Sequence, residues 1–314
     1  MRYIIKKFFM TIITLVVVSF CVFLAFSVIP GDPALKKLGM EASPELVAQV
    51  REEMGLNDPL VVRYYRWISA FVKGDFGTSY SYNKPVMWLI AGKIPNTIIL
   101  GIMAFLITVV VSIPLGIFTA KHENGVIDRV ISVTNQIIMA IPPFFSGILI
   151  SMIFAGVIRL FAPKGYVSYK DNVPGFLWYL LFPAVALALP KIAMTVKMLR
   201  GSVLDEAGKD YTRTAYSRGN RTNEVLYRHV LKNAMIPVIT FLGMVLADMV
   251  AGSIVVEKVF DVPGVSTVLI NSISNRDYPV VQTIIMGIAT IVIVINLLVD
   301  IVYCVIDPRI RIDE

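Results

Sequence analysis

Long apolar runs alternate with shorter polar segments along the chain, and each run is long enough to cross a bilayer as a helix. A helix needs about 20 predominantly apolar residues to span the hydrocarbon core. The pattern therefore predicts an all-α membrane protein with about six transmembrane helices. In chain order the runs are Phe8–Ile29, Thr97–Ala120, Ile131–Phe161, Phe176–Val196, Ile236–Val256 and Val280–Ile306.

The first apolar run follows the basic residues Arg2, Lys6 and Lys7, and in this respect it is similar to a signal peptide. It is longer than the apolar core of a signal peptide, however, and no small-residue cleavage site follows it. The chain continues instead with Pro30-Gly31-Asp32-Pro33. We therefore interpret the run as a retained transmembrane helix.

Basic residues in the short polar segments predict the orientation. Positive residues concentrate on the cytoplasmic side of membrane proteins. Cations precede the first run, lie in the loop Lys121–Arg129, are numerous in the segment Lys197–Lys232 and recur in the tail Asp307–Arg311. All of these places lie on one side of the membrane if the number of spans is even. Both termini are then expected in the cytoplasm.

The segment Gly31–Asn96 is the largest one expected outside the cytoplasm, and it contains two predicted helices. The first begins at Ser43-Pro44-Glu45, which combines a capping hydroxyl, a proline and an acid in the first turn, and it ends at Gly55. The second runs from Pro59 to about Lys73. Its aromatic face suits either the membrane interface or packing onto the ends of transmembrane helices. That face comprises Tyr64, Trp67, Ile68 and Phe71.

Composition agrees with a membrane protein. Of the 314 residues, 56% are hydrophobic and 16% are charged, whereas about 25% of the residues of a soluble domain are charged. The formal net charge is +7. In a soluble protein this charge would suggest nucleic acid as a partner. Here the basic residues flank apolar runs, so membrane topology explains them and no nucleic-acid partner is expected.

The sequence carries no signature of an enzyme. There is no G-x-x-x-x-G-K-[ST] phosphate loop, no H-E-x-x-H zinc motif and no G-x-S-x-G nucleophile turn. Cys21 and Cys304 both lie within apolar runs, and His122 and His229 are the only histidines. We therefore expect no catalytic residues and no metal site. If ATP powers this protein, another chain must bind the nucleotide.

The most informative segment lies between the fourth and fifth apolar runs. From Asp210 it predicts a short helix, then a turn at Gly219, then a second helix that enters the membrane at Pro237. A compact helix that projects into the cytoplasm can dock in a groove on a partner protein. The small side chain of Ala215 would permit close approach, and neighbouring arginines would supply charge.

This segment resembles the EAA loop of ABC importer permeases, in the form found in the dipeptide, oligopeptide and nickel permeases. That form reads roughly D-Y-[VI]-R-T-A-[RY]-x-K-G and then H-x-[LF]-[RK]-N-A-x-[IL]-P. Arg218 stands where lysine is commoner. Arg213 and Thr214 depart from the general EAA consensus, as is usual in this subfamily. The matching residues are Asp210, Tyr211, Arg213, Thr214, Ala215, Gly219, His229, Leu231, Lys232, Asn233, Ala234, Ile236 and Pro237.

The resemblance extends over nearly the whole chain. Further family landmarks occur in order and at family spacings, and the long segment after the first run resembles the B-type member of a pair of permeases. The landmarks are Pro30–Pro33, Gly74–Ser79, Pro95–Thr97, Gly252–Glu257, Val259-Phe260, Pro263-Gly264, Arg276–Pro279 and Asp307–Arg309.

The resemblance implies the type I ABC importer permease fold. Residues 1–93 would hold the first transmembrane helix and the long extracytoplasmic segment. Residues 94–306 would form the permease core, with the coupling loop at about 199–235, and residues 307–314 a cytoplasmic tail. Within the loop, the residues expected to couple to an ATPase are Asp210, Tyr211, Arg213, Thr214, Ala215, Arg218, Gly219 and His229.

The resemblance also implies partners. The chain would form half of a pore with a second, homologous permease in the cytoplasmic (inner) membrane of a bacterium or archaeon. Two ABC ATPase subunits, which use ATP and Mg²⁺, would grip the two EAA loops, and an extracytoplasmic binding protein would deliver the substrate. This chain itself would bind no cofactor. Peptides are the first candidate substrates, with nickel or metal chelates and some sugars as alternatives.

Polar residues inside the predicted spans are the remaining candidates for function, because a charge in hydrocarbon is costly and usually faces the bundle or a cavity. Asp248 can line the translocation path and attract a cationic substrate, or it can bond to the partner chain. Asn296 and Asp300 share one helix face. For Asp300 we expect a structural bond to Arg309 or to a neighbouring helix.

Two other classes of function remain open at this point. A secondary transporter or channel would need buried charge relays at the midplane, for which Asp248 is the one good candidate, and it would leave the docking loop unexplained. A membrane enzyme or assembly factor would need a nucleophile or metal constellation, which the sequence lacks.

Overall fold

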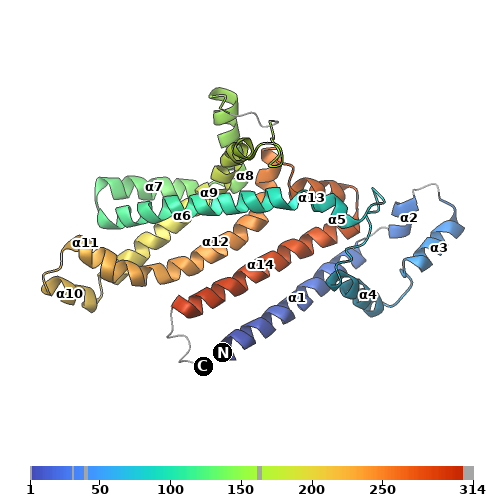
Figure 1. The fold of residues 1–314 in the computed structure, drawn as a ribbon, viewed down its shortest axis with the longest axis horizontal. Helices are drawn as coiled ribbons and strands as arrows, with labels where there is room; N and C mark the ends of the chain where they lie inside the picture. Colours follow the sequence, from blue (N-terminus) through green and yellow to red (C-terminus); the bar gives the residue numbers. More distant parts are fainter. Residues whose placement is uncertain (1, 30–31, 39–41, 161–164, 307–314) are drawn as a thin grey trace.

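The computed structural model describes residues 2–29, 32–38, 42–160 and 165–306, and it is built from helices joined by turns (Figure 1). The described helices are α1 (Arg2–Val28), α2 (Pro33–Leu38), α3 (Pro44–Glu53), α4 (Leu60–Val72), α5 (Val86–Ile90), α6 (Ile94–Lys121), α7 (Val126–Ala140), α8 (Pro143–Ser151), the π-helix η1 (Met152–Val157), α9 (Val173–Ala207), α10 (Asp210–Ser217), α11 (Thr222–Glu224), the π-helix η2 (Val225–Val230), α12 (Leu231–Val259), α13 (Val265–Ser274) and α14 (Tyr278–Ile306).

Five of the described helices are long and apolar enough to cross a membrane, and a bent pair raises the number to six. The five lie in α1, α6, α9, α14 and the continuous helix Thr222–Val259, which α11, η2 and α12 form together. This confirms the predicted all-α membrane fold with about six spans. The bent pair consists of α7 and the helix that follows it.

The third predicted run, Ile131–Phe161, is not one straight helix. Its first half lies in α7, and the helix after it turns away by 106°. Ile141 stands between the two with an extended backbone (φ −85°, ψ 122°), which is the conformation that a residue before a proline prefers. Pro142 thus breaks a run that apolarity alone predicted to be continuous. The end of the run at Phe161 lies outside the described residues.

Helices α6, α9 and α12 pack against one another and form the core. About 61% of the most apolar stretch of α9 is buried, against 11% for α1 and for α14, so α9 is the central helix. Gly116 of α6 lies so close to α9 that a β-carbon on it would come within 2.8 Å of the Leu199 side chain. A larger residue at this position would push the two helices apart.

Helix α14 packs between α12 and α1, as Figure 1 shows. Near the end of α14, the Asp300 carboxylate forms an ion pair with the Lys7 ammonium of α1, with 2.9 Å between Oδ2 and Nζ. The start of α1 and the end of α14 therefore lie side by side. A neighbouring helix is one of the two partners expected for Asp300, and the other, Arg309, lies outside the described residues.

Helix α3 begins as the sequence predicts. The Ser43 hydroxyl accepts a hydrogen bond from the Leu46 amide at 3.3 Å, and Pro44 is the first helical residue. Gly55, just beyond the end of the helix, has a φ of +63°, which favours glycine. These local signals correctly located the element.

The aromatic face of α4 packs on α1. The Tyr64 hydroxyl lies 2.7 Å from the Ser19 hydroxyl, and the Tyr64 ring lies edge-on to Phe20 with 5.2 Å between centroids. The Trp67 ring lies 5.7 Å from that of Phe23. Of the two locations left open for this face, the structure thus supports packing onto a transmembrane helix.

The turn between α12 and α13 is held by the start of α6. The side-chain amide of Asn96 donates to the Pro263 carbonyl at 2.9 Å, and the Thr97 hydroxyl accepts from the Val265 amide at 3.0 Å. Segments that carry landmarks far apart in the sequence therefore meet here.

A buried carboxylate, Glu257, closes the same turn from inside. It accepts hydrogen bonds from the amide of Ser266, at 3.0 Å, and from its hydroxyl. Ser266 is in the first turn of α13, where backbone amides point outward and favour a negative charge. Glu257 therefore caps α13 from α12.

Asp277, just before α14, fastens the loop that precedes α5. Its buried carboxylate accepts hydrogen bonds from the Ser79 hydroxyl and from the amides of Tyr80 and Ser81, at 3.0 and 3.3 Å. Burial, followed by the nearby Asp277 charge, raises the pKa of Tyr80 to about 12. The loop is thus tied to the core by a contact between two of the landmark segments, Gly74–Ser79 and Arg276–Pro279.

Candidate functional site

The predicted coupling segment forms a short helix, α10, at one end of the molecule (Figure 1). Lys209 before it has an extended backbone (φ −77°, ψ 154°). Gly219 after it has a φ of +85°, a left-handed conformation that only glycine adopts without strain. The predicted helix and glycine turn therefore lie where the sequence located them.

Helix α10 is amphipathic, and its two faces have different uses. The side chain of Asp210 is 98% exposed and that of Arg213 is 78% exposed. The two form an ion pair, with 3.8 Å between Oδ1 of Asp210 and Nη1 of Arg213. Thr212 and Ala215 are buried. Ala215 belongs to the same buried cluster as Leu226 of η2, so its small side chain serves close packing within the chain. The exposed face carries the charge.

Polar contacts fasten α10 to the end of α9. The Tyr211 hydroxyl donates to the Glu206 carboxylate at 2.6 Å and accepts from the Asn233 amide at 3.3 Å. The Thr212 hydroxyl donates to the Glu206 carbonyl at 3.1 Å. Burial, followed by the bond to Glu206, raises the pKa of Tyr211. Glu206 also forms an ion pair with Lys209. This one carboxylate therefore binds a residue just before α10 and a residue within it.

The second half of the segment is continuous with a transmembrane helix. Residues Thr222–Val259 form one helix of 38 residues, in which η2 is a π-helical stretch. His229 lies on η2 and is exposed. Arg228 beside it pairs with Glu224 at 2.8 Å. The segment that carries His229 is therefore continuous with the span that contains Asp248.

The structure thus brings the residues predicted for coupling into one region, where they make different contacts. Tyr211 and Ala215 hold the helix against the chain, and Gly219 makes the turn. The remaining predicted residues are exposed and available to a partner. They are Asp210, Arg213, Thr214, Arg218 and His229.

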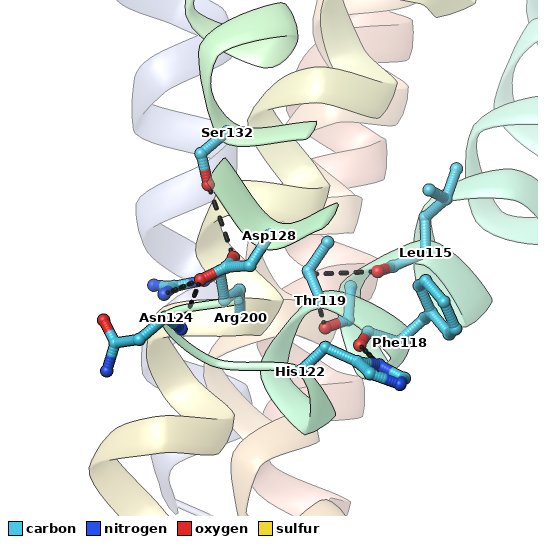
Figure 2. A network of polar contacts seen from close by, with 9 residues as sticks. Leu115, Phe118, Thr119, His122, Asn124, Asp128, Ser132 and Arg200 are labelled. Carbon is cyan, nitrogen blue, oxygen red and sulfur yellow. Dashed lines mark hydrogen bonds and ion pairs between the residues drawn. The ribbon is translucent and has the colours of Figure 1, made fainter. Parts of the chain in front are cut away.

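A second polar site, between α7 and α9, was not identified from the sequence. Figure 2 shows Arg200 directed at the buried carboxylate of Asp128. The guanidinium donates from Nε and Nη2, each at 2.7 Å, in the bidentate geometry that makes such pairs strong. The backbone amide of Asn124 donates to the same carboxylate at 3.0 Å. The pair fixes the start of α7 to the centre of the bundle.

The sequence contained a weak signal for this pair. Asp128 lies in the short loop Lys121–Arg129, and Arg200 lies near the start of the basic segment Lys197–Lys232. The basic residues of both segments were explained by the positive-inside rule, which treats cations as topology signals and does not indicate pairs 72 residues apart. Only the packing of α7 on α9 brings the two together.

Asp248 lies in α12 and forms an ion pair with Lys191 of α9. The Asp248 side chain is 61% exposed and that of Lys191 is 14% exposed. Sequence analysis singled out the acid but not the base. Lys191 directly follows Pro190 within the fourth predicted run, and the pairing neutralises both charges in the middle of the bundle.

Among the residues that the structure describes, no group of three or more His, Cys, Asp or Glu side chains is placed to hold a metal ion. The sites described above offer charged groups, hydrogen bonds and helix-packing surfaces. Such sites can dock a protein or a charged ligand.

Comparison with known proteins gives matches along the whole chain. A family model described as "Binding-protein-dependent transport system inner membrane component" matches residues 112–312. A second, "Binding-prot-dependent transport system membrane comp, N-term", matches residues 1–101.

Curated relatives match at nearly full length. The probable peptide ABC transporter permease protein y4tP of Sinorhizobium fredii is 36% identical, over 98% of this chain and 99% of that protein. The oligopeptide transport system permease protein AppB of Bacillus subtilis is 35% identical, over 98% of this chain and 99% of that protein. The glutathione transport system permease protein GsiC of Salmonella paratyphi A is 35% identical, over 99% of each chain.

Proposed function

The chain belongs to the family of binding-protein-dependent transport system inner membrane components, and from this premise we propose that it forms half of the pore of an ATP-driven peptide importer. Its membership makes it a multi-pass permease subunit of an ABC transporter. The second half of the pore would be a homologous permease. Two ATPase subunits and an extracytoplasmic binding protein would complete the assembly.

The single observation that carries the proposal is the geometry of α10. Its exposed face presents Asp210 and Arg213, while its other face is bound into the chain through Tyr211 and Ala215. A rigid helix with one free charged face is suited to lie in a groove on a partner. Because α10 packs against a helix continuous with a span, movement of the partner is transmitted to the membrane region as a rigid-body shift.

Orientation is part of the proposal. The end of the molecule that carries α10 is also rich in basic residues and includes the start of α1, where Lys7 lies. Placing that end in the cytoplasm satisfies the positive-inside rule and presents α10 to ATPases that bind Mg²⁺ and ATP. The regions would then be 1–93, 94–306 and the tail 307–314, whose residues lie outside the described ones.

Peptides are the substrate class that we propose. The relatives named above are called peptide, oligopeptide and glutathione permeases. Nickel or metal chelates, which related permeases carry, are the second candidate. Asp248 would line the path, and Asp248→Asn should then weaken uptake of cationic peptides. Unchanged uptake with normal assembly would contradict that role.

The coupling role is tested by reversing one exposed charge. Arg213→Glu should lower co-purification of the partner ATPase subunits and slow ATP-dependent peptide uptake into proteoliposomes. The fold should tolerate the change, because Arg213 is 78% exposed and surface substitutions cost within about 0.5 kcal/mol. Lys73→Glu, also an exposed charge reversal but at the far end of α4, is the matched control.

The outcomes separate the classes of function. Normal ATPase binding and uptake with Arg213→Glu would contradict the proposed role of α10. Uptake that follows a proton or sodium gradient without ATP would show a secondary transporter instead.

A further inference from the structure

The ion pair between Lys191 and Asp248 joins two long helices of the bundle. Lys191 stands halfway along α9 (Val173–Ala207), and Asp248 is close to the midpoint of α12 (Leu231–Val259). Both helices qualify as membrane spans. In a membrane that these spans cross, the two opposite charges would lie away from both surfaces.

The exposure of the two partners is unequal. Lys191 is 14% exposed, because it lies within the bundle, while Asp248 is 61% exposed. Asp248 stands in a stripe of exposed residues on α12, which recur at intervals of three and four and so share one helix face. The stripe comprises Met244, Asp248, Ala251 and Val255. One face of α12 therefore carries a charge at its centre.

A charged side chain cannot lie against hydrocarbon at the bilayer centre without a large cost, and such groups face water-filled cavities or other protein. The stripe around Asp248 must therefore face away from lipid. In a pore built from two similar permeases, the water-filled path between them satisfies this requirement and also leaves the ion pair accessible.

We propose that Lys191 and Asp248 form an exchangeable binding site in the translocation path for a ligand that carries both an ammonium and a carboxylate, as a peptide with free ends does. This inference rests on the proposed import function. A ligand with both charges can replace the internal pair by two new ion pairs, one at each residue. A ligand with only a positive charge would displace Lys191 from Asp248 and leave this largely buried ammonium unpaired, which is unfavourable.

The pair also keeps the empty path electrically neutral. Without a ligand, each charge neutralises the other, so neither attracts free ions strongly. With a zwitterionic ligand the site is again neutral, so the ligand can leave toward either side without leaving a charge unpaired. A site that bound through Asp248 alone would hold cations and release them slowly.

The test measures initial rates of ATP-dependent uptake by the complete transporter in proteoliposomes. The probes are labelled trialanine with free ends, N-acetylated trialanine and C-amidated trialanine. The variants are Lys191→Gln, Asp248→Asn and the exchange Lys191→Asp with Asp248→Lys. Glu53→Gln and Lys73→Gln neutralise exposed charges in the long segment after α1 and are the matched controls.

The expected result is selective for the ends of the peptide. Asp248→Asn should lower uptake of free trialanine by about tenfold while changing that of the N-acetylated peptide less than twofold. Lys191→Gln should likewise lower uptake of free trialanine while changing that of the C-amidated peptide little. The exchange variant should recover most of the uptake of the free peptide. The external binding protein is common to all assays, so its own preference cancels when variants are compared.

Equal losses for all three peptides would overturn the proposal and point to a structural ion pair. Uptake by Asp248→Asn equal to that of the unaltered protein for every peptide would also overturn it, and would place the stripe against the partner permease. If the unaltered transporter imports no peptide with ATP, the proposed function itself fails, and the two failures are therefore distinct.

Discussion

Arg200 of α9 holds Asp128 of α7 through two hydrogen bonds of 2.7 Å each. Asp128 is 3% exposed, so its charge depends on this partner. Asp128 is the one buried residue along helix α7. The pair is therefore the main polar connection that positions α7 on the bundle.

Removing that charge should weaken the whole protein. Asp128→Asn loses the charge-assisted bonds and leaves Arg200 partly unpaired, and we expect a loss of about 1.5–3 kcal/mol. Thermal unfolding in detergent measures the loss. A double-mutant cycle with Arg200→Gln isolates the pair, and Glu123→Gln, which removes an exposed acid nearby, is the control. Additive effects of the two single changes would contradict the assignment.

The left-handed turn at Gly219 gives a second prediction. No neighbouring atom lies within 4 Å of the place where a β-carbon would stand, so the effect of Gly219→Ala is one of backbone strain alone. With a φ of +85°, alanine should cost about 1 kcal/mol. Hydrogen exchange of the α10 amides should therefore be about five times faster.

Gly208 provides the control for this change, because it lies between α9 and α10 and has an ordinary φ of −75°. Gly208→Ala should leave hydrogen exchange of α10 unchanged. Equal effects of the two substitutions would show that strain at Gly219 is not the cause.

Close approach of Gly264 to Glu257 leads to a third prediction. A β-carbon on Gly264 would stand 2.2 Å from Oε2 of Glu257, so alanine must displace the carboxylate that caps α13. A buried group left without its partner costs about 1–3 kcal/mol, and the melting temperature of Gly264→Ala should fall accordingly.

Gly252 is the comparison for this site, because a β-carbon there would make an ordinary contact of 3.7 Å with Leu187. Gly252→Ala should change the melting temperature little. A stable Gly264→Ala protein would mean that α13 does not need the carboxylate of Glu257.

Alkaline pH should loosen the loop before α5. Tyr80 has a folded pKa of about 12, raised from 10.0 by burial and then by Asp277. As the pH rises, Tyr80 therefore loses its proton in the unfolded chain before it does so in the folded protein. The contribution of neutral Tyr80 to the free energy of unfolding is complete below pH 10 and is lost as the pH rises from 10 to 12. The loss should reach about 2 kcal/mol, measured as the melting temperature against pH.

Tyr80→Phe should abolish that component of the pH dependence, since phenylalanine has no proton to lose. Tyr82→Phe, which alters an exposed ring in the same loop, should leave it intact. A pH profile that is the same for all three proteins would exclude Tyr80 as its source.

Local signals predicted most of the elements. The caps of α3, the glycine after α10 and the apolar length of the spans are properties of neighbouring residues, and they located those helices within a few positions. The Pro142-Pro143 pair was also visible, but apolarity on both sides concealed its effect. The bend of 106° depends on how the following helix packs, which no local pattern describes.

Pairings between distant residues could not be predicted in the same way. Asp128 with Arg200 and Asp248 with Lys191 each join different helices. A hydropathy pattern says which residues are buried in lipid or protein, but not which helix lies beside which.

The sequence by itself determined that this chain crosses a membrane, where most of its long helices lie, and where the short helix α10 and its glycine turn lie, because hydrophobic length and capping act over a few residues. Only the tertiary structure decided that Ala215 packs inward while Arg213 faces out, and that Asp248 has a lysine for a partner. The physical reason is that exposure and ion pairing depend on packing between helices far apart in the chain.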